Sequence, residues 1–216
     1  MATAKADKIE IPALDIRTLE LTLIGDTPLL CHAWSQKAKM QLREKSTKKA
    51  SAGKAAIIPH IDFAESLYWL TEKPEFSATT SDAEAKEILN EIIPHSRFGF
   101  PNTGFKESAV SAGLQCGVIK YKINARAAFF IQGEFAEIIG TPTLREDIIR
   151  IQGKSATPRH RAEFKEWATK VTIQYNASMM SAEQIANLFR MGGFAIGVGD
   201  WRPARGGTFG MYHVGG

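Results

Sequence analysis

The sequence predicts an α+β fold, and three stretches carry this prediction. Over residues 17–25 leucines alternate with polar residues, which is the period-two pattern of a half-buried strand. Residues 171–176 repeat the pattern with Val, Ile and Tyr on one side. Between this second strand and the C-terminus, Ser181 and Gln184 form a capping-box pair before residues with helical apolar spacing. Strands and helices without regular βα alternation are typical of the α+β class.

The first third of the chain is predicted to hold one strand and a basic insertion. Residues 1–15 show little periodicity, so we expect a flexible leader before a single domain over residues 16–216. The turn at residues 26–28 ends the first strand, and residues 29–34 are expected to continue it in a bent or bulged form. Residues 35–56 hold almost no large apolar side chains, which predicts a disordered or partly ordered loop.

The middle of the chain is predicted to contain three helices and three strands. Helical spacing indicates helices over residues 62–70, 83–92 and 103–114, the last with Thr103 as its N-cap. This third helix is rich in small residues, which suits close packing on a sheet or another chain. Apolar runs then predict strands over residues 127–132, 135–139 and 147–152, and a projecting hairpin over residues 147–170.

The C-terminal part completes a recognisable order. After the strand at residues 171–176, a helix is expected from Ser181 to the glycines at 192–193, and a glycine loop leads to a strand at residues 209–214. Without its insertions, the chain has the order strand, helix, strand, strand, helix, strand. This order is the split βαβ arrangement of the ferredoxin-like (RRM-like) fold.

Composition limits the function classes. Cys31 and Cys116 have no paired spacing and the five histidines are scattered, so we expect no disulfide framework, no metal site and no cofactor. No apolar run reaches membrane-spanning length and no signal-peptide pattern begins the chain, which predicts a cytoplasmic protein without a membrane partner. Walker, nucleophile-elbow and His-Glu-x-x-His motifs are missing from the sequence.

Positive charge is concentrated in one segment. Residues 37–54 carry a net charge of +6 while the whole chain carries +4, so the remainder is negative. Such a segment suits contact with a polyanion, or it is a solvated loop whose lysines aid solubility. The candidate nucleic-acid contacts in it are Lys37, Lys39, Arg43, Lys45, Lys48, Lys49 and Lys54.

The glycine loop after the last helix is the second candidate site. It carries Trp201, Arg202 and Arg205, a combination that suits close approach to a phosphate chain and its bases. The alternative is a glycine-rich turn whose Trp packs on the core. Further candidates are Lys106 at a helix N-terminus, and Arg159, Arg161 and Lys165 on the hairpin. The loop glycines are Gly197, Gly199, Gly206, Gly207 and Gly210.

Two motifs give the chain a family resemblance. The run Phe100-Pro-Asn-Thr-Gly-Phe-Lys106 is similar to the Pro-Gly-Ser-Ser-x-Lys-Gly motif of the RAMP superfamily, the RNA-binding backbone subunits of CRISPR effectors. The glycine loop resembles the glycine-rich loop of the same family, in the same order along the chain. The resemblance covers about half of the chain. Residues 102–104 replace the small-residue run of the family motif. Residues 201–203 are similar to uncharacterised phage proteins, and this second likeness suggests a phage-encoded member acting in the host cytoplasm.

The resemblance implies that the sheet and the glycine loop hold single-stranded nucleic acid, RNA or DNA, that a hairpin inserts between bases, and that copies polymerise along the strand. We therefore expect a non-catalytic single-strand binder that forms homo-oligomers. One alternative is a phage structural or interaction protein, or a mimic of a CRISPR subunit, that works without nucleic acid. The other is a metal-independent endoribonuclease using Asp26 or His32, although the sequence shows no pairing of a base with a stabilising group.

Overall fold

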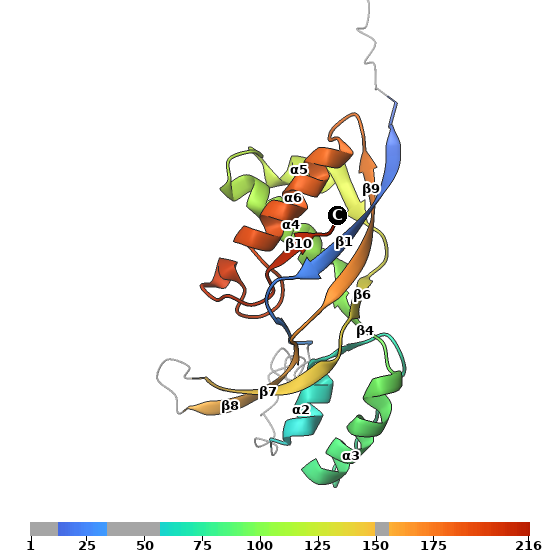
Figure 1. The fold of residues 1–216 in the computed structure, drawn as a ribbon, viewed down its shortest axis with the longest axis vertical. Helices are drawn as coiled ribbons and strands as arrows, with labels where there is room; N and C mark the ends of the chain where they lie inside the picture. Colours follow the sequence, from blue (N-terminus) through green and yellow to red (C-terminus); the bar gives the residue numbers. More distant parts are fainter. Residues whose placement is uncertain (1–12, 34–56, 150–155) are drawn as a thin grey trace, which may run out of the picture.

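The computed structural model describes residues 13–33, 57–149 and 156–216. It combines helices with antiparallel sheets, which confirms the α+β class. Figure 1 shows an upper body, where helices α4 (Asn102–Gln115), α5 (Lys122–Ala128) and α6 (Ala182–Ala195) lie on one side of the larger sheet. In the lower part, α2 (Pro59–Ser66) lies beside β7 (Pro142–Ile149) and β8 (Thr157–Phe164), and α3 (Asp82–Ile92) lies beside α2. No helix in the described ranges is both long and apolar enough to span a bilayer.

The larger sheet has the strand order β10-β1-β9-β6-β4-β3, and β5 also pairs with β9. Each pairing is antiparallel. Because β1 and β6 are both antiparallel to β9, they run in the same direction, and β9 and β10 do so for the same reason. The strands are β1 (Ile16–Gly25), β3 (Tyr68–Trp69), β4 (Phe98–Pro101), β5 (Phe129–Ile131), β6 (Phe135–Ile139), β9 (Ala168–Asn176) and β10 (Tyr212–Val214).

The two alternating stretches form the centre of this sheet. In β1, Leu21 and Leu23 are buried, and Leu21 lies opposite Val171 of β9. The β9 residues Val171, Ile173 and Tyr175 are also buried while their neighbours face away from the core. The predictions of half-buried strands at both places are confirmed.

A second sheet has the order β2-β8-β7, with β2 (Leu29–Cys31), β8 (Thr157–Phe164) and β7 (Pro142–Ile149). The pairing of β7 with β8 continues that of β6 with β9, since Ile139 lies opposite Ala168 and Pro142 lies opposite Phe164. One long hairpin therefore enters both sheets. Its outer half begins at Pro142, five residues before the predicted start of that strand. The residues after the first turn do form a strand, β2, but it joins this second sheet.

The helices cover one face of the larger sheet and one side of the smaller. Helices α4 and α6 pack on each other, and between them and the sheet lie Phe105, Phe129, Phe189 and Tyr212, all fully buried. Aromatic rings in such T-shaped and tilted contacts stabilise the core beyond the area they bury. The helices are α2 (Pro59–Ser66), α3 (Asp82–Ile92), η1 (Ile93–His95), α4 (Asn102–Gln115), α5 (Lys122–Ala128), α6 (Ala182–Ala195) and η2 (Pro203–Arg205).

Two helices begin as the sequence predicts or close to it. Ser181 and Gln184 form both hydrogen bonds of a capping box at the start of α6. Ser81 and Glu84 do the same for α3, which starts one residue before the predicted helix at residues 83–92. Reciprocal capping satisfies amide groups that the helix itself leaves without partners.

Tertiary contacts move several other boundaries. Helix α2 stops at Ser66, not at residue 70, because the buried Ser66 hydroxyl donates to the Phe63 carbonyl and accepts the Ala162 amide of β8. Residues 68–69 then join the sheet as β3. Thr103 is not the N-cap of α4, since the helix begins at Asn102, whose backbone N–H and side-chain amide donate to carbonyls of residues 132–134.

Three further elements differ in extent. Residues 127–128 belong to α5, so the predicted strand over residues 127–132 is reduced to β5. Helix α6 does not end at Gly193 but continues to Ala195. Glycine at 193 serves close packing instead of ending the helix, since a Cβ there would lie 1.8 Å from the Tyr212 carbonyl oxygen. The last strand, β10, begins at Tyr212 and not at residue 209.

Candidate nucleic-acid interface

A groove of about 440 Å³ separates one side of α4, from Thr103 to Gln115, from the glycine loop, residues 197–210. The two motifs that the sequence singles out therefore face each other across one space, although almost a hundred residues separate them in the chain. The lining residues of opposite walls that matter below are Thr103, Glu107, Ser111, Asp200 and Arg202, with His32 of the segment after β2 between the walls.

Backbone hydrogen bonds fix the glycine loop. The Val198 N–H donates to the Gly210 carbonyl across the loop, at 2.9 Å, and the Gly210 N–H donates to the Pro28 carbonyl at 2.8 Å. The Asp200 N–H donates to the Leu30 carbonyl of β2. Of the five predicted glycines, all except Gly207 have left-handed backbone, with φ between 66° and 77°. The loop is thus held in one shape against the segment that follows β1.

The two loop arginines remain available for other partners. Arg202 lines the groove and donates one hydrogen bond from its guanidinium to the Gly199 carbonyl, at 2.9 Å. Arg205 ends the short helix η2 and is exposed. Within the part of the chain that the structure describes, neither guanidinium takes part in an ion pair.

Arg161 does not lie on the surface, contrary to its grouping with the contact residues of the hairpin. Its side chain is only 4% exposed, because this residue of β8 faces the glycine loop. The guanidinium carbon lies 5.0 Å from the centroid of the Trp201 ring, and Nε lies 3.6 Å from a carboxylate oxygen of Asp200. A terminal nitrogen also lies 3.9 Å from Asp147, so Arg161 contacts Trp201, Asp200 and Asp147 and is almost closed off from solvent.

Arg145 belongs to the same cluster and was missed by the sequence reasoning. Its guanidinium donates to Asp147 on β7 and to Glu163 on β8, and it lies 4.8 Å from the Phe209 ring centroid. The sequence carried one signal for it, since Arg145 and Arg161 are each two residues from an acidic residue. The register that places the two arginines opposite each other comes from the fold. The cluster fixes the glycine loop to the hairpin.

Glu107 is an acidic residue in the groove wall, and cations neutralise it. Burial raises its pKa, but hydrogen bonds from Lys122, Arg126 and Ser111 outweigh burial and bring the pKa to about 2. Asp200, the other carboxylate of the groove, faces the buried Arg161. Neither carboxylate is thus an uncompensated charge that repels a phosphate.

Replacing Glu107 with glutamine is expected to flatten the acid limb of the stability curve. The folded-state pKa is below the ordinary value of 4.5, so the stabilisation is fully present above pH 4.5 and is lost as the pH falls toward 2. Glu107→Gln removes this contribution at neutral pH, and its stability should fall less between pH 4.5 and 2 than that of the parent. Urea unfolding across this range measures the difference, with Glu87→Gln on the exposed face of α3 as control. An unchanged acid limb in Glu107→Gln contradicts the expectation.

Lys106 faces away from the groove. Its ammonium group donates to the Arg126 carbonyl of α5 at 2.8 Å and lies 3.9 Å from the centroid of the Phe130 ring. Burial and the nearby Arg126 guanidinium lower the pKa of Lys106. Its contacts connect α4 to α5 and β5.

A second cavity, of about 330 Å³, lies between the end of β2, helix α2 and the start of β8. Ala33 and Ile57, the residues on either side of segment 34–56, both line it, as does Arg159. The candidate cations Lys37, Lys39, Arg43, Lys45, Lys48, Lys49 and Lys54 lie outside the described residues. Lys165 is exposed just beyond the other end of β8.

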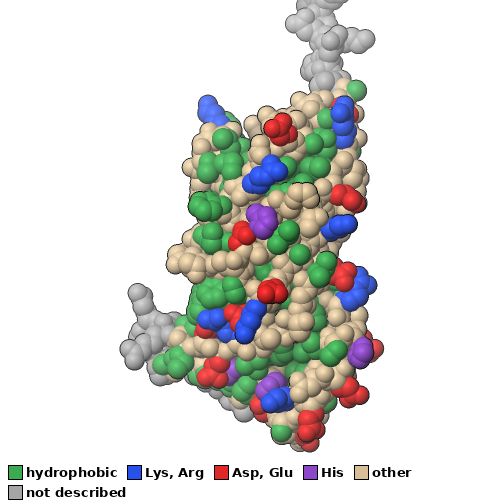
Figure 2. All heavy atoms as spheres, viewed as in Figure 1, with side chains coloured by type: hydrophobic (Ala, Val, Ile, Leu, Met, Phe, Trp, Pro, Cys, Tyr) green, Lys and Arg blue, Asp and Glu red, His purple; other side chains and the backbone are tan. Residues whose placement is uncertain are grey.

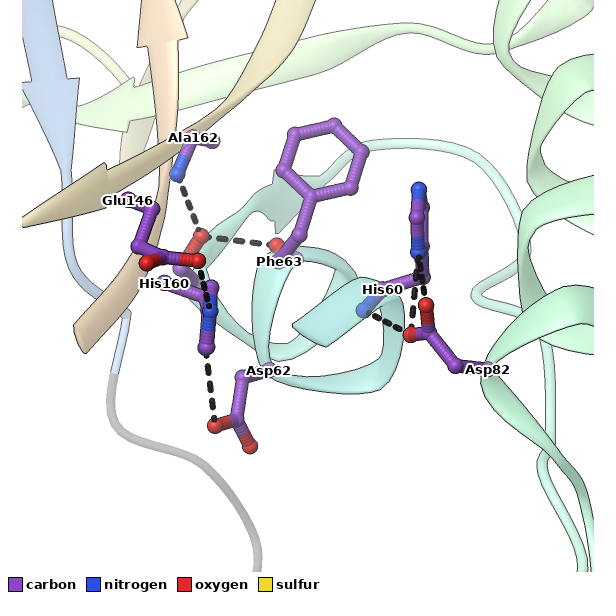
Figure 3. A network of polar contacts seen from close by, with 8 residues as sticks. His60, Asp62, Phe63, Asp82, Glu146, His160 and Ala162 are labelled. Atoms are coloured by element: carbon purple, nitrogen blue, oxygen red, sulfur yellow. Dashed lines mark hydrogen bonds and ion pairs between the residues drawn. The ribbon is translucent and has the colours of Figure 1, made fainter. Parts of the chain in front are cut away.

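Polar contacts fix α2 beside this cavity. Figure 3 shows the His160 ring between Glu146 and Asp62, with Nε2 3.0 Å from Glu146 and Nδ1 3.9 Å from Asp62. On the other side of the helix, Nδ1 of His60 lies 2.9 Å from Asp82 at the start of α3. These contacts, with the bond from Ala162 to Ser66, make α2 a fixed wall.

The two residues considered for catalysis lie in different places. His32 lines both cavities, and burial lowers its pKa, with Asp200 opposing this effect and Arg161 and Arg159 adding to it. Asp26 lies in the turn after β1, where it forms a 2.6 Å contact with the His213 ring of β10. The structure does not bring His32 and Asp26 together.

Charge on the face seen in Figure 1 is mixed. Figure 2 shows Lys and Arg side chains interspersed with Asp and Glu on this face, with hydrophobic side chains between them. No broad positive area covers the described residues on this face. The excess positive charge of the chain is the +6 of residues 37–54.

No protein-family model matches the chain, and no curated protein matches it. Among solved structures, a crystal structure of Cmr6 from Pyrococcus furiosus matches with a TM-score of 0.37 and 12% identity, over 94% of this chain and 100% of that one. This likeness is too weak to support an argument about function. The function therefore has to be inferred from the residues of the groove.

Proposed function

We propose that this protein binds single-stranded nucleic acid, RNA or DNA, without cleaving it, and that copies associate along the bound strand. The observation that carries the proposal is the meeting of the two motifs in one groove, where Arg202 lines the wall. Trp201 and Arg205 belong to the same loop and are both exposed. Such a groove and loop together supply cations for phosphates and an aromatic ring for bases.

The sheet order supports the ferredoxin-like core and, with it, the RAMP resemblance. Taken in chain order, β1, α4, β6, β9, α6 and β10 form two βαβ units, and the strands lie in the order β10-β1-β9-β6. This is the interleaved order of a split βαβ arrangement. A phage origin rests only on the residues at 201–203.

The electrostatics also support the proposal. Both carboxylates of the groove face cations, and the two ends of the basic segment flank a cavity that shares His32 with the groove. In the sequence, the seven cations of that segment stand between these two lining residues, Ala33 and Ile57. Phosphate neutralisation by such cations gives a binding constant that falls with salt.

We expect anisotropy titrations with a labelled single strand to show a steep salt dependence. Each phosphate contact contributes about 0.7 to the slope of log affinity against log salt, so Arg202→Gln with Arg205→Gln should lower the slope by about 1.4 and the affinity by about tenfold. Arg190→Gln is the matched control, because Arg190 is exposed on α6 and bonds only Asn187 among the described residues. A flat salt response of the parent protein would rule out the proposal.

An apolar surface favours association between copies. Val118, Tyr121 and Ile123, in and after the loop joining α4 to α5, are each more than half exposed, and Leu114 near the end of α4 is partly exposed. Exposed apolar side chains gathered in one segment favour an interaction site. The same surface suits the alternative of an interaction protein that works without nucleic acid. Absorbance at 260 and 280 nm of the purified protein, and its mass on strands of increasing length, separate the two functions.

His32 favours a second alternative, a metal-independent endoribonuclease. A histidine in a groove with a lowered pKa is neutral at pH 7, as a general base requires. End-labelled RNA incubated without metal tests this function, with His32→Ala and Asp26→Ala as controls. Cleavage that His32→Ala abolishes would replace the binding-only proposal.

A further inference from the structure

We infer that Trp201, backed by the buried Arg161, is a stacking position for a purine base. The inference rests on the proposed function and adds to it the class of base that the groove prefers. Three features of Trp201 carry it: its backbone, the charge behind its ring, and its open surface.

The backbone of Trp201 is strained. Its φ is +52°, and it is the one non-glycine residue with positive φ in the described ranges. Bulky side chains rarely adopt this region, and such strain gathers at functional sites. The Phe209 N–H holds it there by donating to the Trp201 carbonyl at 3.1 Å. The loop is thus built to aim this ring at β8.

The Trp201 ring contacts one apolar side chain, the tilted Phe209 ring at 6.0 Å between centroids, and it also lies against two charged groups. Arg161 and Arg145 have guanidinium carbons 5.0 Å and 5.9 Å from the ring centroid. Within the described residues, Nε and one terminal nitrogen of Arg161 have no hydrogen-bond partner although they are buried. Carboxylate oxygens of Asp200 and Asp147 lie 3.6 Å and 3.9 Å from these two nitrogens, within ion-pair range but beyond hydrogen-bonding distance. A buried cation that is incompletely hydrogen-bonded is costly, so its position under the ring calls for a role.

The ring is not closed off on all sides. Trp201 is 37% exposed, and its neighbours in the chain, Asp200 and Arg202, line the groove. A base stacked on this surface would lie one residue from Arg202, which can meet the adjoining phosphate. Ring and cation are thus spaced as a nucleotide requires.

The guanidinium groups of Arg161 and Arg145 favour one class of base. A cation close to an aromatic ring withdraws π-electron density from it, and such a ring stacks more strongly with an electron-rich partner. Purines have the larger and more electron-rich π surface, and base preference in single-strand grooves follows stacking strength. Trp201 should therefore prefer adenine or guanine over uracil, thymine or cytosine.

The test compares labelled homopolymers of about 12 nucleotides, adenine against uracil for RNA and adenine against thymine for DNA. We expect the purine strands to bind about tenfold more tightly and to quench tryptophan emission. Trp201→Leu should remove both the preference and the quenching while leaving the salt slope unchanged. Arg161→Met should reduce the preference, and Arg161→Lys, which keeps a cation under the ring, should retain it. Thermal melts show which variants are folded.

Each outcome decides the inference. Equal binding of purine and pyrimidine strands by the parent protein, or a preference that persists in folded Trp201→Leu, overturns the stacking position and leaves the proposed function standing. Absence of binding to every strand overturns both. Retained preference in folded Arg161→Met removes the role of the buried cation.

Discussion

Replacing Gly210 with alanine is expected to lower the melting temperature by about 6–12 °C, which corresponds to about 3 kcal/mol for a chain of this size. Two causes add together. The residue has φ of +66°, where an alanine costs about 1 kcal/mol or more. In addition, the new Cβ would lie 1.8 Å from the Val198 carbonyl oxygen, so the two sides of the glycine loop have to separate.

Separation would break the hydrogen bonds that fix the loop, from Val198 to Gly210 and from Gly210 to Pro28. Gly206→Ala is the matched control: its φ of +77° is equally unfavourable, but no atom lies within 4 Å of the added Cβ. We expect it to cost about 1 kcal/mol and to shift the melting temperature by about 2–4 °C. Circular dichroism melts measure both. Equal shifts in the two variants would mean that backbone strain alone, and not the close packing of the loop, requires glycine at 210.

Local patterns in the sequence predict the elements whose contacts are local. The alternation in β1 and β9, the apolar spacing of α3 and the capping box of α6 depend on residues within a few positions of each other, and the structure has all four elements. The candidate groove could be foreseen in outline for the same reason, because each of its two glycine motifs is a continuous run of residues.

Contacts between distant residues decide what the sequence could not predict. Ser66 ends α2 through a bond to Ala162, nearly a hundred residues away, and Asn102 starts α4 through bonds to residues 132–133. Periodicity holds no information on such partners. The contacts of Lys106 also depend on a distant residue. Its place in the first turn of α4 suggested a phosphate contact, but its ammonium group donates a hydrogen bond to the Arg126 carbonyl.

Burial of charge is the hardest feature to foresee. On the hairpin, arginines and acidic residues alternate as they would on an exposed ribbon, a pattern that favours cross-strand pairs in solvent. The glycine loop covers that ribbon, and Arg161 and Glu163 are less than 10% exposed as a result. The covering segment is 40 residues further along the chain, and only the fold brings the two together.

This burial makes Arg145→Met the second substitution with a large expected effect. Its guanidinium bonds Asp147 at 3.0 Å and Glu163 at 2.7 Å, and the two carboxylate side chains are only 9% and 10% exposed. Without the arginine, Glu163 has no cation at bonding distance among the described residues. Removing one partner of a buried ion pair costs about 3–5 kcal/mol, so the melting temperature should fall by about 6–20 °C.

The chain offers a matched control in Arg97→Met. Arg97 holds Glu137 with two hydrogen bonds of 2.7 Å and 2.6 Å, but the two side chains are 62% and 43% exposed. Water screens this pair, so its loss should cost no more than about 1 kcal/mol. Urea unfolding of both variants at neutral pH gives the comparison, and a cost for Arg145→Met no greater than that for Arg97→Met would contradict the role of the buried cluster.

A double variant separates the two explanations of a large loss. If the cost of Arg145→Met comes from the buried Glu163 carboxylate left without a cation, Arg145→Met with Glu163→Met should recover part of the lost stability. Replacing both members of a buried ion pair with apolar groups of similar volume often leaves stability unchanged. If the cost comes instead from detaching the glycine loop, through the lost contact with Phe209, the double variant should stay as unstable as the single one. In the second case the hairpin and the loop are held together as one rigid body. A nucleic-acid strand bound by the loop would then also have a fixed position relative to the hairpin.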